Sequence, residues 1–202
     1  MWRFGTSPRR AVPKGLPSSS TQHCFPRGSY LHSAPLFSHS WHTDITYIAT
    51  GEGWLYLATV IDCCTKEVIG YAMDDHYQTP LISRAIRNAA RNRNLSADAI
   101  FHSDRGSNYM SAEFGRTLDR FGLRRSAGRT GICFDNAMAE SFFGALKNER
   151  VSRVAYLTRE SARQDITRYI EFWYNRKRLH SAVGYRPPRE VHAEYEKLRI
   201  SA

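Results

Sequence analysis

The chain has 202 residues, 42% of them hydrophobic, which is enough for one domain with a buried core. Lysine and arginine number 29 against 19 acidic residues, and a formal net charge of +10 favours a polyanionic partner such as nucleic acid. No apolar run approaches the length of about 18 residues that a membrane helix needs, and no secretory signal is present, so we expect a cytoplasmic protein with no membrane partner.

The four cysteines, Cys24, Cys63, Cys64 and Cys133, contain no Cys-x-x-Cys pair. This spacing argues against a structural zinc site. In a reducing compartment we expect them to be thiols.

Residues 1–40 differ in composition from the rest of the chain. They contain no aspartate or glutamate and five of the eight prolines, without a helical or strand periodicity. We therefore predict that 1–40 is a disordered segment and that 41–202 form the folded domain.

Three strands are predicted first, over residues 44–48, 54–61 and 68–73. They are rich in β-branched and aromatic residues, and short turns separate them. Short connections indicate an antiparallel meander.

Helices then alternate with short strands. Thr79 is expected to cap a helix with Pro80 at its first position, and Ser111 a second helix that Gly122 closes. Strands are predicted at 99–103 and, at the sheet edge, at 123–126, and a glycine-rich loop is predicted at 128–131. Later helices are predicted at 137–147, at 159–173 and, as a short helix, after Pro187-Pro188. In the helix at 159–173, we expect the inward-facing residues to be Ile166, Tyr169, Ile170 and Trp173. A helical crossover between strands indicates a mixed sheet with helices on its faces, an α/β fold.

Three carboxylates are placed where such a fold can gather them. Asp44 is on the first strand, Asp104 ends the fourth strand, and Glu140 is in the first turn of the third helix. Phosphodiester chemistry needs such groups, because two Mg²⁺ ions bound by carboxylates can activate the attacking oxygen and stabilise the leaving one. With 19 acidic residues, spacing alone does not identify the site.

The sequence around each carboxylate is more specific. The segments are Trp-His-Thr-Asp-Ile-Thr-Tyr at 41–47, His-Ser-Asp-Arg-Gly-Ser-Asn-Tyr at 102–109, Asp-Asn-Ala-Met-Ala-Glu-Ser-Phe-Phe-Gly-Ala-Leu-Lys-Asn-Glu at 135–149 and Tyr-Asn-Arg-Lys-Arg-Leu-His-Ser at 174–181. From Trp41 to about Glu194, the chain closely resembles the integrase-like core of bacterial insertion-sequence transposases, the second-frame, OrfB-type proteins of the retroviral-integrase superfamily.

The resemblance implies an RNase H-like fold with a mixed five-stranded sheet between helices, a three-layer α/β/α arrangement. It implies that Asp44, Asp104 and Glu140 form the DDE triad and hold two Mg²⁺ or Mn²⁺ ions. The implied activity is cleavage of element ends and strand transfer, without a covalent protein intermediate. The implied partners are double-stranded DNA, as terminal repeats and target at the bacterial nucleoid, and further copies of the chain.

Other residues near the motifs are candidate DNA contacts. Lys147 follows Glu140 by two helical turns and so shares its face. Asn136 is a candidate for helix capping or substrate contact, and Arg105 for ordering its loop or touching DNA, as is Asn108. Arg178 and His180 are candidates for phosphate contact, with a solvated or dipole-facing position as the alternative. Asp62 is interpreted as a turn residue and not as a fourth ligand.

Residues 1–40 lack the helical segment and the helix-turn-helix that the resemblance leads one to expect upstream. We therefore expect that the chain is a truncated or frameshifted remnant. Two alternative functions stay open: a catalytically inert fragment that binds DNA, and an RNase H-like nuclease.

Overall fold

The computed structural model describes residues 40–93, 99–103, 106, 108–127 and 137–200, all within a unit that spans Leu31–Ala202. The disorder predicted for the N-terminal segment and the predicted loop at 128–131 concern residues outside these ranges, except Ser40, which begins the first strand. None of the helices in the described ranges has the length and apolar character that a membrane crossing requires.

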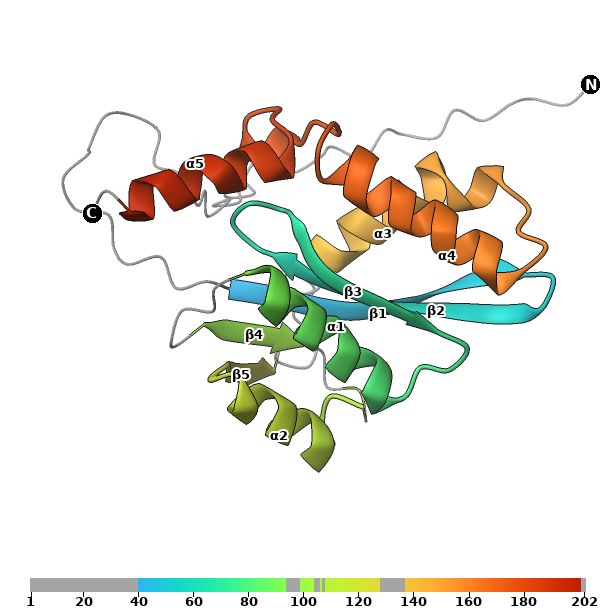
Figure 1. The fold of residues 1–202 in the computed structure, drawn as a ribbon, viewed down its shortest axis with the longest axis horizontal. Helices are drawn as coiled ribbons and strands as arrows, with labels where there is room; N and C mark the ends of the chain where they lie inside the picture. Colours follow the sequence, from blue (N-terminus) through green and yellow to red (C-terminus); the bar gives the residue numbers. More distant parts are fainter. Residues whose placement is uncertain (1–39, 94–98, 104–105, 107, 128–136, 201–202) are drawn as a thin grey trace, which may run out of the picture. The chain divides into compact units, whose positions relative to one another are not determined.

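A five-stranded mixed sheet forms the centre of this unit (Figure 1). Its strands are β1 (Ser40–Thr50), β2 (Gly53–Asp62), β3 (Val68–Asp74), β4 (Ile100–Ser103) and β5 (Arg124–Ala127), in the order β3-β2-β1-β4-β5. The first three pair antiparallel, whereas β4 pairs parallel with β1 and with β5. The predicted meander, the helical crossover and the edge position of the last strand are confirmed.

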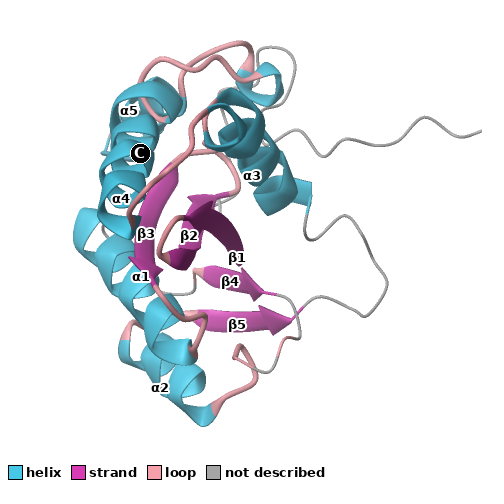
Figure 2. Ribbon diagram, turned by 90° about the vertical axis from the view of Figure 1, so that its right-hand side faces the viewer, coloured by secondary structure: helices cyan, strands magenta, loops and turns pink. Residues whose placement is uncertain are grey.

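Helices cover both faces of the sheet (Figure 2). Alternate residues of β2 point to opposite faces, as the strand period of two requires. Ala58 and Val60 pack with α1 (Thr79–Asn92) and α2 (Ala112–Arg120). Leu55 and Leu57 pack with α3 (Ala137–Glu149) and α4 (Arg159–Arg168). The three-layer α/β/α arrangement is therefore confirmed.

Two predicted helix boundaries have different outcomes. Ser111 caps α2 as expected, since its hydroxyl accepts a hydrogen bond of 3.1 Å from the backbone N–H of Phe114. Gly122 follows this helix with a φ of 64°, which its lack of a Cβ allows. The prediction for Thr79 is wrong by one residue, because Gln78 is the N-cap and Thr79 begins α1. The Thr79 hydroxyl instead bonds to the carbonyl oxygen of Asn108 at 3.3 Å.

The fourth predicted helix changes its winding. After Arg168 it continues as a π-helical turn over Tyr169–Tyr174. A π turn contains more residues than an α turn, so it displaces the following side chains around the axis. The prediction that Trp173 faces inward is wrong: Trp173 is 48% exposed, and Tyr174 is buried in the core.

The chain after this turn is attached to the edge strand β3. The buried side chain of Asn175 accepts a hydrogen bond from the backbone N–H of Val68 and donates one to its carbonyl oxygen, both 3.0 Å. The last helix, α5 (Pro188–Ile200), has 13 residues and is longer than the short helix predicted. Its His192 lies 3.6 Å from the buried carboxylate of Glu67.

His180 packs against the π turn. Its half-buried ring lies edge-on to Tyr174, with ring centroids 4.8 Å apart, and its Nε2 is 3.4 Å from a guanidinium nitrogen of Arg178. Burial and the positive charge of Arg178 lower the pKa of His180 to about 4. We infer that the folded protein keeps this imidazole neutral.

Gly70→Ala is expected to lower the free energy of unfolding by about 1–3 kcal/mol, because overpacking forces backbone shifts. A Cβ at Gly70 would lie 2.4 Å from the backbone nitrogen of Ala89 and 2.5 Å from the carbonyl oxygen of Ala85. Gly115→Ala is the matched control, since nothing lies within 4 Å of a Cβ there. It should stabilise α2 by about 0.5–1 kcal/mol. Urea unfolding followed by circular dichroism measures both, and equal stabilities of the two variants would contradict the prediction.

The lowered pKa of His180 predicts a pH-dependent stability. Between about pH 6.5 and pH 4 the unfolded chain binds a proton at His180 that the folded chain excludes. The neutral His180 therefore contributes to the stability of the folded chain above pH 6.5, and this contribution is lost as the pH falls towards 4. For a half-buried group it amounts to roughly 1–2 kcal/mol after allowance for solvent screening. Urea unfolding from pH 7.5 to 4.5 should show a smaller acid-induced loss in His180→Gln. The lowered pKa of His192 acts in both proteins, so equal slopes would refute the assignment to His180.

Candidate active site

Asp44 lies on β1, the central strand of the sheet. Its side chain is half-buried, and its Oδ1 accepts a hydrogen bond of 2.7 Å from the backbone N–H of Ile45. By strand alternation, Asp44 is on the same face of β1 as Ile48, which packs with α3 and α4. The carboxylate therefore belongs to the sheet face that α3 covers.

The second predicted carboxylate, Asp104, lies outside the described residues. The strand before it is described: β4 ends at Ser103, and His102 is the partner of His42 in the parallel pairing with β1. The structure thus describes β4 up to the residue that precedes Asp104 in the sequence.

Glu140 is exposed in the first turn of α3. The same helix buries Ala139, Phe142 and Leu146 against the sheet. Lys147, two turns after Glu140, places its Nζ 5.1 Å from the ring centroid of Tyr47 on β1, a cation–π contact. Helix α3 therefore brings Lys147 to the strand that carries Asp44.

Other candidates near the triad serve turns and loops. The Oδ1 of Asp62 accepts hydrogen bonds from the backbone N–H groups of Cys64 and Thr65, both 2.8 Å, which agrees with its interpretation as a turn residue. The side-chain amide of Asn108 donates to the carbonyl oxygen of Tyr77 at 2.7 Å, so it orders the loop before α2. Cys63 and Cys64 carry thiols and form no disulfide. The candidates Arg105 and Asn136 lie outside the described residues.

Near the other end of α3, Arg178 contacts Glu149, and His180 lies against Arg178 and Tyr174. The Nε of Arg178 is 2.7 Å from the Glu149 carboxylate, which also accepts bonds from the Tyr169 hydroxyl at 2.9 Å and the Trp173 indole N–H at 3.1 Å. Burial alone would raise the pKa of Glu149, but these donors stabilise the charged form and lower it. This contact holds the segment after the π turn on α3.

One further group of residues has the donors of a metal site. Among the described residues, ligand atoms of Asp74, Asp75 and His76 lie within 4.8 Å of one another. Burial alone would raise the pKa of Asp74, but a backbone hydrogen bond from Asp75 and the Arg84 guanidinium lower it. The ion pair with Arg84 accounts for Asp74, so we assign no metal to this group.

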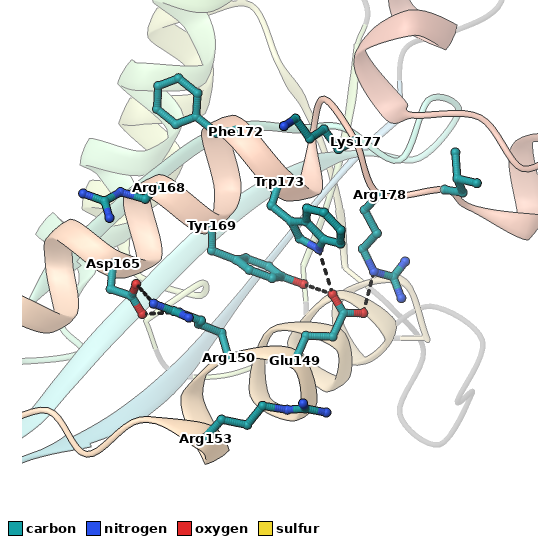
Figure 3. Close-up of a pocket in the computed structure, with 11 residues that line it drawn as sticks. Glu149, Arg150, Arg153, Asp165, Arg168, Tyr169, Phe172, Trp173, Lys177 and Arg178 are labelled. Atoms are coloured by element: carbon teal, nitrogen blue, oxygen red, sulfur yellow. Dashed lines mark hydrogen bonds and ion pairs between the residues drawn. The ribbon is translucent and has the colours of Figure 1, made fainter.

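A groove along the C-terminal end of α3 was not predicted from the sequence (Figure 3). Arg178 was predicted as a candidate phosphate contact, whereas Arg150, Arg153 and Arg168, which also line this groove, were not predicted. The interleaving of basic and aromatic residues after Glu149 is the signal that could have indicated it.

Two family models match the chain. Residues 38–133 match one model of the integrase core domain, and residues 122–188 match a second model of the same description. The two matches overlap at residues 122–133; the first includes Asp44 and Asp104, and the second includes Glu140.

Bacterial insertion-sequence proteins are similar to the chain in sequence. It is 38% identical over 185 residues to the transposase InsF for insertion sequence IS3A of Escherichia coli, covering 90% of this chain and 64% of the relative. It is 41% identical over 158 residues to an uncharacterized 31 kDa protein of insertion element IS600 from Shigella sonnei, covering 78% and 58%. The chain thus spans about three fifths of the length of these relatives.

Solved structures of retroviral integrases have the same fold. The catalytic core domain of BIV integrase matches with a TM-score of 0.60 at 16% identity, covering 81% of this chain and 99% of that one. The HTLV-2 integrase catalytic core domain in complex with magnesium matches with a TM-score of 0.59 at 14% identity, covering 77% and 96%. The fold is therefore RNase H-like, and the chain belongs to the insertion-sequence transposases that carry an integrase core domain.

Proposed function

We propose that the chain is the catalytic core of a transposase that cleaves the ends of an insertion element and joins them to target DNA. Asp44, Asp104 and Glu140 are the proposed carboxylates of the reaction. The observation that carries this proposal is the half-buried Asp44 on the central strand, on the sheet face against which α3, the helix of Glu140, packs.

The pairing of β1 with β4 supports a shared location for the two aspartates. His42 is the partner of His102, and Asp44 and Asp104 each follow this pair by two residues. In open α/β sheets, groups that bind ligands gather at the carboxyl ends of parallel strands. Asp104 directly follows the described end of β4.

The contact between Lys147 and Tyr47 supports the placement of Glu140. Lys147 shares the helical face of Glu140, and its Nζ lies 5.1 Å from the ring centroid of Tyr47 on β1. Ile48, on the same face of β1 as Asp44, packs in one cluster with Phe142 of α3. Both contacts favour a position of Glu140 on the Asp44 side of the sheet.

The donor set fits divalent metal ions of the hard type. Carboxylate oxygens on Asp44 and Glu140, with a third carboxylate in Asp104, are the ligands that Mg²⁺ prefers, and two Mg²⁺ or Mn²⁺ ions are expected. When bound, such ions polarise the scissile phosphate and lower the pKa of the attacking hydroxyl or water. The chain's own contribution is to hold the carboxylates on two rigid elements, a central strand and a packed helix.

Double-stranded DNA is the proposed partner, as element ends and as target. Lys147, Asn136 and Arg105 are the proposed phosphate contacts nearest the carboxylates. For Arg178 and His180, the contacts with Glu149 and Tyr174 support a positioning role in holding the C-terminal segment. Pairing of two ends would require at least two copies of the chain, acting on nucleoid DNA in the bacterial cytoplasm.

A strand-transfer assay tests the function. The protein is incubated with a labelled duplex that carries a terminal repeat, a target plasmid and Mn²⁺, and joined products are measured on a gel. Asp44→Asn and Glu140→Gln should each reduce joining by at least a hundredfold, because the remaining carboxylates bind the ions poorly. Joined products that persist in both variants would refute the assignment.

Glu113→Gln is the matched control. Glu113 is exposed in the first turn of α2, as Glu140 is in α3, so both substitutions remove the same favourable interaction with a helix N-terminus. Glu113→Gln should therefore retain strand joining.

Fragments without joined products would instead indicate a nuclease, and DNA binding without cleavage by the unsubstituted protein would indicate an inert core.

A further inference from the structure

The groove at the C-terminal end of α3 has a volume of about 780 Å³. It is lined by residues of α3, of the 3-10 turn Val151–Arg153, of α4, of the π turn and of the segment that follows. We call it the basic groove. Glu149 follows Glu140 by nine residues, which corresponds to about 14 Å along the helix and to the opposite helical face. The basic groove is therefore separate from the proposed carboxylate site.

The basic groove has an excess of positive charge. Its lining includes five cations, Arg150, Arg153, Arg168, Lys177 and Arg178, and two carboxylates, Glu149 and Asp165. Both carboxylates are already engaged: Arg178 pairs with Glu149, and Arg150 bonds to both oxygens of Asp165 at 2.7 and 2.6 Å. Arg153, Arg168 and Lys177 are exposed, so their charges can meet an anionic ligand. The Nε of Arg153 also donates to the carbonyl oxygen of Asn148 at 2.8 Å, and Arg168 contributes to the electrostatic field at Asp165.

Two large aromatic side chains are exposed in the same groove. Phe172 is 57% exposed and Trp173 is 48% exposed. Each side chain also has one polar contact within the protein. The Arg176 guanidinium lies 5.5 Å from the Phe172 ring centroid, and the Trp173 indole N–H donates a hydrogen bond to Glu149. Figure 3 shows Tyr169, Trp173 and Arg178 converging on Glu149, with Phe172 and Lys177 apart from this cluster. The π turn places these two consecutive aromatics at the surface.

We propose that the basic groove binds single-stranded DNA, with phosphates on Arg153, Arg168 and Lys177 and an unpaired base stacked on Phe172. Cations beside exposed aromatic rings are the combination that binds single strands. In a duplex the faces of the bases are covered by their neighbours, so exposed rings have no surface to stack on. A second copy of the chain is disfavoured because its charge is also positive. The choice of DNA over another polyanion rests on the proposed function.

Fluorescence anisotropy of the full chain with a labelled single-stranded 20-mer tests the proposal. The variant with Arg153→Gln, Arg168→Gln and Lys177→Gln should weaken binding at least tenfold. It should also reduce the slope of log K against log salt by about two, since each lost phosphate contact in a single strand contributes roughly 0.7. The control carries Arg87→Gln, Arg116→Gln and Arg120→Gln on α1 and α2, three exposed arginines. An equal loss in the control would refute the proposal.

The aromatic part of the basic groove has its own test. Phe172→Ala should weaken single-strand binding about tenfold, and Phe172→Trp should restore it, because base stacking needs only an aromatic face. Tyr77→Ala is the matched control, since Tyr77 is 58% exposed and lies outside the groove. Unfolding curves for each variant exclude a loss of fold. Unchanged binding by Phe172→Ala, or equal losses for duplex and single strand, would overturn the proposal.

A third outcome assigns the basic groove to a second copy of the chain. Sedimentation would then show a dimer that Phe172→Ala dissociates, with DNA binding unchanged, and the proposal would be wrong. Binding is measured in the double variant Asp44→Asn, Glu140→Gln as well. Failure of strand transfer alone would refute the proposed function, whereas a groove without effect on DNA binding would refute only this inference.

Discussion

The pairing of β1 with two neighbours is the constraint on which the other elements depend. Strand β1 pairs antiparallel with β2 over ten residue pairs and parallel with β4 near the beginning of β1. Most of its side chains are buried or half-buried, and a buried polar group costs free energy unless it is bonded. Asp44 is half-buried on this strand, and its Oδ1 accepts a hydrogen bond from the following backbone N–H, which restricts the position of the carboxylate.

Helix α3 connects the two regions for which functions are proposed. Its N-terminal turn carries Glu140, its middle buries Phe142 and Leu146 in the core, and its last turn carries Glu149. Glu149 binds the π turn and the segment after it through three donors. A displacement of this helix would therefore change both the distance between the carboxylates and the width of the basic groove.

Local chemistry was sufficient to predict much of the fold. Ser111 as a cap, Gly122 in a left-handed conformation and the three-strand meander all follow from short-range preferences. The inward position of Trp173 was wrong because a 3.6-residue period assumes uniform winding, and the π turn shifts it. No local sequence pattern indicates the π turn. The turn is followed by Asn175, whose side chain makes two hydrogen bonds to the backbone of Val68, and these residues are 107 positions apart in the sequence.

By itself, the sequence determined the family and the α/β class and predicted the three carboxylates, because motifs and periodicities are properties of neighbouring residues. Only the tertiary structure decided that Lys147 lies against Tyr47 and that Arg178 is engaged by Glu149. It also decided that Arg153, Arg168, Phe172 and Lys177 line one groove. Such assignments depend on how helices cross the sheet, and packing between distant segments sets those crossings.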